Sequence, residues 1–159
     1  MNKSIHLNTA QPARFDASSV AIDGYRAMLG LHNYVQRCGL EEALLELVKI
    51  RVSQINGCVY CVAMHIPLAR KCGVSEERMH LLPVWREAPI YSPRERAALS
   101  WAEALNQLSN GAVTSAVYTE AKQQFSGNEI ADLVYTVIEI SGWNRLMIAS
   151  RTPPQIEGA

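Results

Sequence analysis

Apolar side chains recur at helical spacing almost from one end of this chain to the other, and this periodicity most strongly constrains the fold. Apolar residues follow the i, i+3, i+4 pattern of amphipathic helices through successive segments. No segment alternates apolar and polar residues over the length of a strand. We therefore predict an all-α fold: an extended arm over residues 1–15, a single helical domain over 16–150 and a tail over 151–159.

Residues typical of helix ends divide this pattern into separate helices. Ser92 precedes Glu95, and Ser126 precedes Glu129, with the spacing of a capping box that opens a helix. Asn56-Gly57 indicates a helix end, because both residue types tolerate a left-handed backbone. The helices expected from these signals cover about 18–37, 40–54, 58–71, a short helix from 75 that Pro83 limits, 92–108, 114–125 and 126–149.

Composition and charge exclude several classes of function. The chain has 15 Lys and Arg against 15 Asp and Glu, without a basic run, so we expect no nucleic-acid partner. No stretch approaches the roughly 18 apolar residues of a spanning helix, and the first ten residues do not resemble a secretory signal. We expect a cytoplasmic protein that does not bind membranes. Charged residues make up 19% of the chain, which leaves apolar surface that a homo-oligomer could bury.

The segment from Cys58 to His65 carries the clearest chemical signal. At about 100° per residue, Cys58, Cys61 and His65 share one face of a helix. Cys58 falls at the helix N-terminus, where free backbone N–H groups favour a thiolate, and the spacing also allows a disulfide. His65 lies one turn beyond Cys61 and could take its proton. The two arguments favour different cysteines as the more reactive thiol.

Two other interpretations of these residues are open. A single cysteine is more often a small core residue, but the three residues at this spacing favour a redox dithiol. A zinc site is the other alternative, although structural zinc needs four ligands. We expect no metal, and no nucleotide cofactor either, since the chain lacks a Gly-rich loop. A fourth zinc ligand would have to come from Cys38, Cys72, His32 or His80.

Glu46 and Tyr60 are further candidate catalytic residues. Glu46 lies among leucines, where a partly buried carboxyl could exchange protons with the site. Residue types alone favour a surface glutamate paired with Lys49 or Arg51. Tyr60 could donate a hydrogen bond to a thiolate or a peroxide oxygen, or it could only contribute to packing. Cys38 and Cys72 have no evident partner, and we expect buried, inert thiols there.

Glu46, followed by Cys58-Val59-Tyr60-Cys61 and then His65, resembles the pattern of a known family. It is that of the AhpD-like alkylhydroperoxidase branch of the carboxymuconolactone decarboxylase family. The flanking segments 47–57, 95–99 and 143–145 are similar too, so the resemblance covers roughly residues 15–150. The decarboxylases of the family lack this cysteine pair, so the resemblance favours the peroxidases.

The resemblance implies an AhpD-like helical bundle that assembles into homo-oligomers, commonly trimers or hexamers. The implied activity is antioxidant peroxide reduction. Cys61 would attack the peroxide, Cys58 would resolve the sulfenic acid to a Cys58–Cys61 disulfide, and His65 with Glu46 would relay protons. An external dithiol, such as a lipoyl or thioredoxin-like protein, would reduce the disulfide.

One position departs from the best-known peroxidases of the family. Tyr60 stands where these enzymes have a second histidine, so part of the proton relay that the resemblance implies is missing. A redox-sensing or zinc-binding helical module without peroxidase turnover is the alternative function.

Overall fold

The computed structural model describes residues 12–154 and 156 of the chain. Within these residues all regular structure is helical, which confirms the predicted all-α class. Most of the predicted arm, and part of the predicted tail, lie outside the described residues, so the domain boundaries stay a prediction. The helices are α1 (Ile22–Val35), α2 (Glu42–Asn56), α3 (Val59–Lys71), α4 (Glu76–Leu81), α5 (Pro93–Asn106), α6 (Ser115–Gln124) and α7 (Gly127–Ser150), with 3-10 turns η1 (Leu82–Val84) and η2 (Leu108–Asn110).

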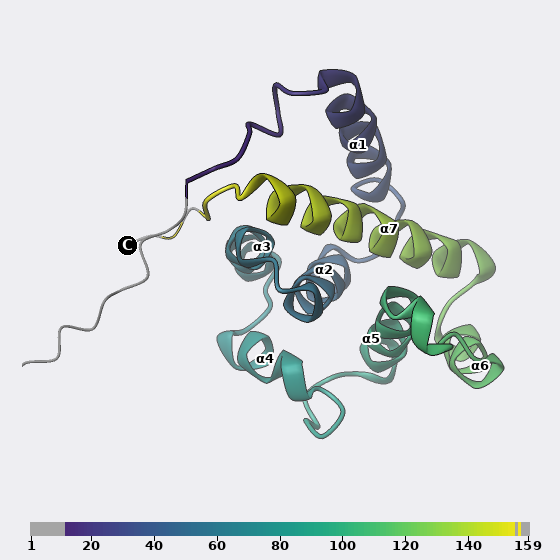
Figure 1. Cartoon of the computed structure of the whole chain (residues 1–159). Helices are drawn as coiled ribbons and strands as arrows, with labels where there is room; N and C mark the ends of the chain where they lie inside the picture. Colours follow the sequence, from purple (N-terminus) through teal and green to yellow (C-terminus); the bar gives the residue numbers. More distant parts are fainter. Residues whose placement is uncertain (1–11, 155, 157–159) are drawn as a thin grey trace, which may run out of the picture.

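Helix α2 lies at the centre of the bundle, with α3, α5 and α7 packed around it (Figure 1). A helix enclosed on several sides must carry apolar residues around most of its circumference. Accordingly Leu47, Val48, Ile50 and Val52 of α2 are completely buried. The buried polar residues of α2 therefore need partners on the neighbouring helices.

Both predicted capping boxes are present. The Ser92 hydroxyl accepts the Glu95 N–H while the Glu95 carboxylate accepts the Ser92 N–H, and Ser126 and Glu129 form the same pair of bonds. Each box satisfies backbone donors that the first turn of a helix leaves free. The sequence therefore positions the beginnings of α5 and α7 locally.

The start of the first helix differs from the prediction. The pattern predicts a helix from Ser18, but α1 begins at Ile22. The Asp16 carboxylate accepts the Ser18 N–H at 2.9 Å, and Ala21 adopts a left-handed backbone with φ of 56°. A non-glycine residue in that conformation interrupts a helix. Residues 17–21 therefore form turns, although their apolar spacing is helical.

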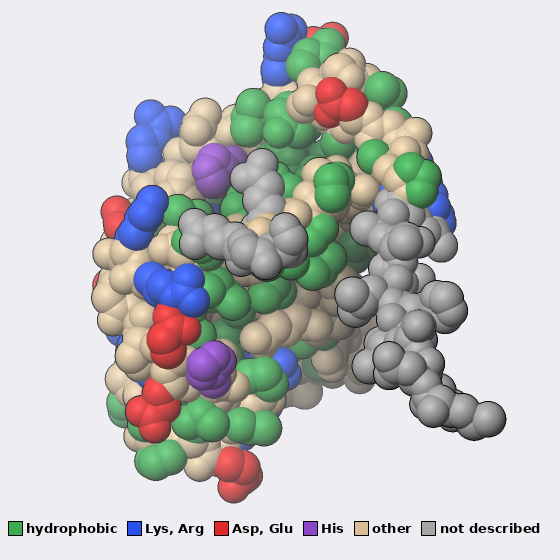
Figure 2. All heavy atoms as spheres, turned by 90° about the vertical axis from the view of Figure 1, so that its left-hand side faces the viewer, with side chains coloured by type: hydrophobic (Ala, Val, Ile, Leu, Met, Phe, Trp, Pro, Cys, Tyr) green, Lys and Arg blue, Asp and Glu red, His purple; other side chains and the backbone are tan. Residues whose placement is uncertain are grey.

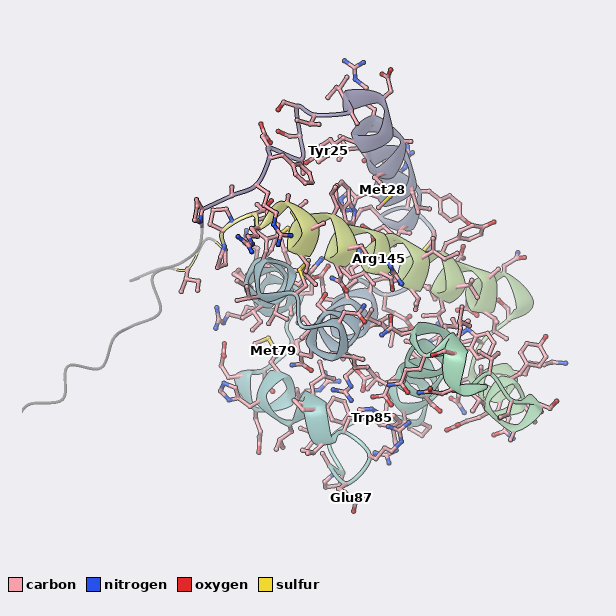
Figure 3. The ribbon with its side chains drawn as sticks, viewed as in Figure 1. Tyr25, Met28, Met79, Trp85, Glu87 and Arg145 are labelled. Atoms are coloured by element: carbon pink, nitrogen blue, oxygen red, sulfur yellow. A yellow bond between two sulfur atoms is a disulfide. The ribbon has the colours of Figure 1, made fainter. Side chains whose placement is uncertain are left out.

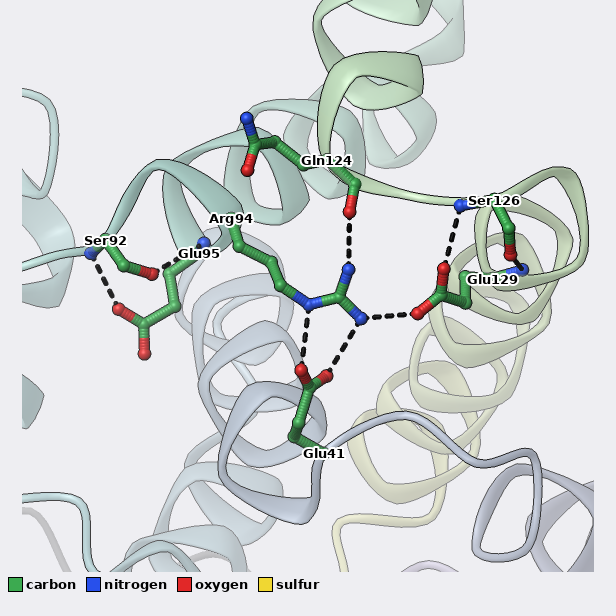
Figure 4. Close-up of polar contacts among 7 residues, drawn as sticks. All are labelled: Glu41, Ser92, Arg94, Glu95, Gln124, Ser126 and Glu129. Atoms are coloured by element: carbon green, nitrogen blue, oxygen red, sulfur yellow. Dashed lines mark hydrogen bonds and ion pairs between the residues drawn. The ribbon is translucent and has the colours of Figure 1, made fainter.

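Arg94, at the start of α5, joins three other elements (Figure 4). Its Nε donates to Glu41 Oε1 at 2.8 Å, before α2, and its Nη2 donates to Glu129 Oε1 at 2.5 Å, in the first turn of α7. Nη1 donates to the Gln124 carbonyl at the end of α6. We call Arg94, Glu41, Glu129 and the Gln124 carbonyl the Arg94 cluster.

Helix α1 packs across the last turns of α7 through Tyr25 and Met28 (Figure 3). The Tyr25 ring meets Trp143 edge-on, with centroids 5.3 Å apart. The Met28 methyl lies where a side chain at Gly142 would be, 2.7 Å from an added Cβ. Gly142 therefore lets α1 approach α7 closely.

In the described part of the chain, no helix has the length and hydrophobicity needed to cross a membrane.

Candidate active site

The turn between α2 and α3 brings Cys58 to the start of α3. Gly57 has a left-handed backbone with φ of 71°, and its N–H donates to the Gln54 carbonyl at 3.3 Å. The Cys58 N–H donates to the Ser53 carbonyl at 3.0 Å. This pair of bonds is a Schellman motif, which requires a residue such as glycine in the left-handed position. Asn56-Gly57 therefore ends α2 as predicted and fixes the backbone of Cys58.

Cys58 is the N-cap residue of α3 and is joined to Cys61 by a disulfide. The two Cα atoms are 5.4 Å apart, and both residues are 1% exposed. The Cys61 N–H donates to Cys58 Sγ at 3.3 Å. In the reduced protein, this bond and the positive end of the α3 dipole favour a thiolate at Cys58.

His65 and Glu46 form a buried pair between α3 and α2. His65 Nδ1 lies 2.7 Å from Glu46 Oε2, and the two residues are 2% and 5% exposed. With Nδ1–H donating to the carboxylate, Nε2 is the ring atom left to accept a proton. Cys61 and His65 both lie on the buried face of α3, so the structure brings the predicted base and the cysteine pair onto the same side of the helix.

The interpretation of Glu46 as a surface glutamate paired with Lys49 or Arg51 is wrong. Both cations have other partners: Lys49 Nζ lies 3.2 Å from Glu139 Oε2, and Arg51 donates to Glu103 at 2.6 Å. The central position of α2 buries Glu46 instead and leaves His65 as its partner.

Tyr60 lies on a different side of α3 from His65. It is half-buried and lines a cavity of about 680 Å³ on the outward face of that helix. Figure 2 looks at this side of the molecule and shows hydrophobic side chains in the middle of the face. Tyr60 therefore lies at the outer surface, and it also packs against the hydrophobic core that includes Cys58 and Cys61. Other residues along the cavity are Met64, Ile66, Pro67, Arg70 and Ile156.

Cys38 and Cys72 carry free thiols, as expected, but the prediction that they are buried is wrong, since both are half-buried. Burial and a neighbouring carboxylate raise the pKa of the Cys72 thiol, whose Sγ lies 3.6 Å from Glu42. Neither thiol joins the Cys58–Cys61 pair. Among the residues that the structure describes, no group of three or more His, Cys, Asp and Glu could hold a metal ion.

A second buried charge pair, which sequence reasoning missed, lies on the α7 side of α2. Lys49 is completely buried and faces Glu139, whose other carboxylate oxygen lies 2.9 Å from His32 Nδ1. Burial raises the pKa of Glu139, but the bond to His32 and the charge of Lys49 outweigh it, so the net pKa is lowered. The available signal was an acidic residue at a buried helical position of the apolar helix α7.

Comparison with known proteins agrees with this fold. Residues 23–104 match the carboxymuconolactone decarboxylase family. The uncharacterized protein YdfG of Bacillus subtilis is 35% identical over 130 residues, which are 82% of this chain and 88% of that protein. The uncharacterized protein YnjA of Escherichia coli is 28% identical over 62% of this chain and 53% of its own length.

Two solved structures are also similar. A protein of unknown function from Agrobacterium tumefaciens, named a candidate antioxidant defence protein AhpD, superposes with a TM-score of 0.89 at 34% identity, over 92% of this chain and 100% of that one. The debrominase Bmp8 has a TM-score of 0.75 at 19% identity, over 84% of this chain and 72% of its own, and shares the fold alone. The chain belongs to the carboxymuconolactone decarboxylase family and is an AhpD-like member of it.

Proposed function

We propose that this protein is a cysteine-dependent hydroperoxide reductase with an antioxidant role. The observation that carries the proposal is the Cys58–Cys61 pair at the N-terminus of α3, on the buried side of the helix that also holds His65 against Glu46. A dithiol beside a buried acid–base pair can accept an oxygen atom from a peroxide and exchange the protons that the reaction needs.

The proposed cycle begins with the reduced pair. The Cys61 thiolate attacks one peroxide oxygen, the O–O bond breaks, and a proton from the His65 imidazolium neutralises the departing alkoxide or hydroxide. Cys61 is then a sulfenic acid. The Cys58 thiolate attacks its sulfur and forms the disulfide, and the hydroxide that leaves takes up a proton from His65 to become water. His65 obtains the protons for both steps from the two cysteine thiols. The pair loses two electrons in total, and the peroxide yields one alcohol and one water, or two waters when it is hydrogen peroxide.

Glu46 supports the histidine in this scheme. Its carboxylate accepts the Nδ1 proton of His65, which fixes the tautomer in which Nε2 exchanges protons and stabilises the imidazolium. Tyr60 is proposed as a donor to a bound peroxide oxygen. Its place beside the cavity on α3 gives it access to a substrate that arrives from the surface.

An external dithiol, such as a lipoyl or thioredoxin-like protein, would complete the cycle by thiol–disulfide exchange. We further propose a homo-oligomer, a trimer or hexamer, located in the cytoplasm. Exposed apolar residues of α3 support assembly, because Val59, Met64 and Leu68 present hydrophobic side chains at the surface.

The decisive experiment measures consumption of an organic hydroperoxide in the presence of excess dithiothreitol. We expect many turnovers per protein molecule, none for Cys61→Ala, and a loss of about 10²-fold or more for His65→Ala, the usual contribution of an acid–base residue. Cys38→Ala is the matched control and should retain full activity. A single stoichiometric oxidation without further turnover would overturn the proposal and leave a redox-sensing module.

A second experiment, with the same peroxide and the variants that lack one cysteine of the pair, tests the roles of the two cysteines. With Cys58→Ala, a sulfenic acid should persist on Cys61 and be captured there by a dimedone-type reagent. The hydrogen bond from the Cys61 N–H favours a thiolate at Cys58, so capture on Cys58 in the Cys61→Ala protein would reverse the assignment.

Zinc in stoichiometric amount that shields both thiols would contradict the peroxidase proposal altogether.

A further inference from the structure

Asn144 of α7 bridges the two ends of the last turn of α2. Its Nδ2 donates to Ser53 Oγ at 2.9 Å, and its Oδ1 accepts from Asn56 Nδ2 at 2.9 Å. Ser53 begins the Schellman motif, and Asn56 is the last residue of α2 before Gly57. One carboxamide therefore holds both sides of the turn that leads into Cys58.

The bridge continues to α5. Asn56 Nδ2 also donates to Asn106 Oδ1 at 3.1 Å, and Asn106 Nδ2 returns a bond to Asn56 Oδ1 at 2.9 Å. Ser141, one turn before Asn144 on α7, donates to Asn106 Oδ1 at 3.0 Å. We call Ser53, Asn56, Asn106, Ser141 and Asn144 the amide cluster. All five side chains are neutral, and the cluster ties α2, α5 and α7 together at the cysteine turn.

The innermost members of the cluster are enclosed. Ser53 is completely buried and Asn144 is 1% exposed, so water cannot replace a bond that is lost there. The same Ser53 accepts the Cys58 N–H through its carbonyl, at 3.0 Å. Asn144 therefore acts on the residue whose backbone anchors Cys58, through hydrogen bonds to Ser53 and Asn56 and not to either sulfur.

We propose that Asn144 is a positioning residue for the cysteine pair. By holding Ser53 and Asn56 together, it keeps Cys58 at the N-cap of α3 after the disulfide is reduced, and so raises the effective concentration of the Cys58 thiol towards Cys61. Preorganisation of this kind speeds an intramolecular reaction without adding a chemical group. The role rests on the proposed function, because it concerns the step in which Cys58 attacks a sulfur bonded at Cys61.

An exchange equilibrium with glutathione measures this effective concentration without any peroxide. A glutathione thiolate opens the Cys58–Cys61 disulfide to a mixed disulfide and one free thiol. The free thiolate then attacks the mixed disulfide, expels glutathione and restores the ring. Each step breaks one S–S bond and forms another, so the exchange needs no other oxidant. The ratio of protein disulfide to mixed disulfide, trapped with acid and read by mass spectrometry, reports how well Cys58 is placed.

We expect Asn144→Ala to lower this ratio about tenfold, because it removes both bridging hydrogen bonds and each is expected to contribute about threefold. Ser53→Ala removes only one of the two bridging bonds and should lower the ratio about threefold. Thr136→Ala is the matched control: Thr136 is completely buried on the same helix, but its hydroxyl bonds the Asp132 carbonyl. Its ratio should equal that of the wild-type protein.

The outcomes separate this inference from the proposed function. An unchanged ratio in a folded Asn144→Ala protein, or an equal fall in Thr136→Ala, overturns the positioning role even when the wild-type protein consumes peroxide. A fall confined to Asn144→Ala and Ser53→Ala supports the role even when no peroxide turnover is found. If Asn144→Ala does not fold, Ser53→Ala decides the question alone.

Discussion

The two ends of helix α2 are fixed by side chains of opposite kinds. Before its first turn, Glu41 is held by the guanidinium of Arg94, which also binds Glu129 and the Gln124 carbonyl. At its last turn, Asn56 is held by the neutral carboxamides of the amide cluster. Both arrangements join α2 to α5 and α7, but only one of them lies next to the cysteine pair.

The difference follows from burial and from the chemistry nearby. The Arg94 side chain is 26% exposed and that of Glu41 is 56% exposed, so these charges keep part of their hydration. A charge at the position of Asn144 would lose nearly all of it, at a cost of several kcal/mol. Neutral amides supply directional bonds next to Cys58 without adding net charge beside the thiol. We infer that the Arg94 cluster mainly stabilises the fold, whereas the amide cluster also serves the site.

The largest expected effect on stability comes from Arg94→Ala. It removes two ion pairs, a backbone bond and the packing of the guanidinium on the Phe125 ring, 4.1 Å from its centroid. We expect a loss of about 2–4 kcal/mol in the free energy of unfolding, measured by urea denaturation. The glutathione exchange ratio should not change. A change of several-fold would show that the Arg94 cluster also positions the cysteine pair.

A matched control for this substitution is Arg26→Ala. Arg26 pairs with Asp23 at the surface, where both side chains are more than half exposed. Such a pair contributes under about 1 kcal/mol. An equal loss of stability in both variants would show that the network around Arg94 adds nothing to an ordinary surface pair.

The second effect is the loss of stability in Asn144→Ala. Removal of the carboxamide leaves Ser53 and Asn56 without one partner each, and Ser53 is completely buried, so water cannot replace its bond. We expect a loss of about 1–3 kcal/mol in the free energy of unfolding, together with the fall in exchange ratio. If Asn144→Ala loses stability but keeps the wild-type exchange ratio, the amide cluster only stabilises the fold, as the Arg94 cluster does.

The next largest difference between the two clusters should be in how stability depends on acidic pH. Backbone and side-chain bonds from Ser126 and the bond from Arg94 lower the pKa of Glu129 from 4.5 to about 2. Because the folded pKa is below the unfolded one, this contribution to stability is complete above pH 4.5 and is lost as the pH falls towards 2. Melting temperatures across this range should fall less steeply for Arg94→Ala than for the wild-type protein.

The amide cluster has no titrating group, so Asn144→Ala should keep the wild-type slope of melting temperature against pH. Parallel curves for wild type and Arg94→Ala would contradict the part assigned to the ion pair with Glu129, and would leave the capping bonds of Ser126 as the source of the low pKa.

Salt should produce the smallest difference. Raising NaCl from about 0.1 to 1 M shortens the screening length from about 10 to 3 Å. The stability difference between wild type and Arg94→Ala should shrink by less than about 1 kcal/mol, because the pairs are in direct contact and partly buried. The difference between wild type and Asn144→Ala should stay constant. Equal salt dependence in both variants would mean that charge does not distinguish the two ends of α2.

Local features of the chain predicted most of the fold. The capping boxes at Ser92 and Ser126 and the Asn56-Gly57 stop depend on bonds within a few residues, so they could be identified before any tertiary contact was known. The prediction was wrong at the start of α1. There the bond from Ser18 to Asp16 and the left-handed Ala21 interrupt a segment whose apolar spacing is helical.

The sequence by itself determined the helical class, the family pattern and the shared helix face of Cys58, Cys61 and His65, because helical geometry fixes neighbours at three and four residues. Only the tertiary structure decided that Glu46 meets His65, that Lys49 meets Glu139, and that Asn144 holds the turn before Cys58. Asn144 and its partner Ser53 are 91 positions apart. Such pairs depend on which residues of α3 and α7 reach α2 when the bundle packs, and no short-range pattern encodes that choice.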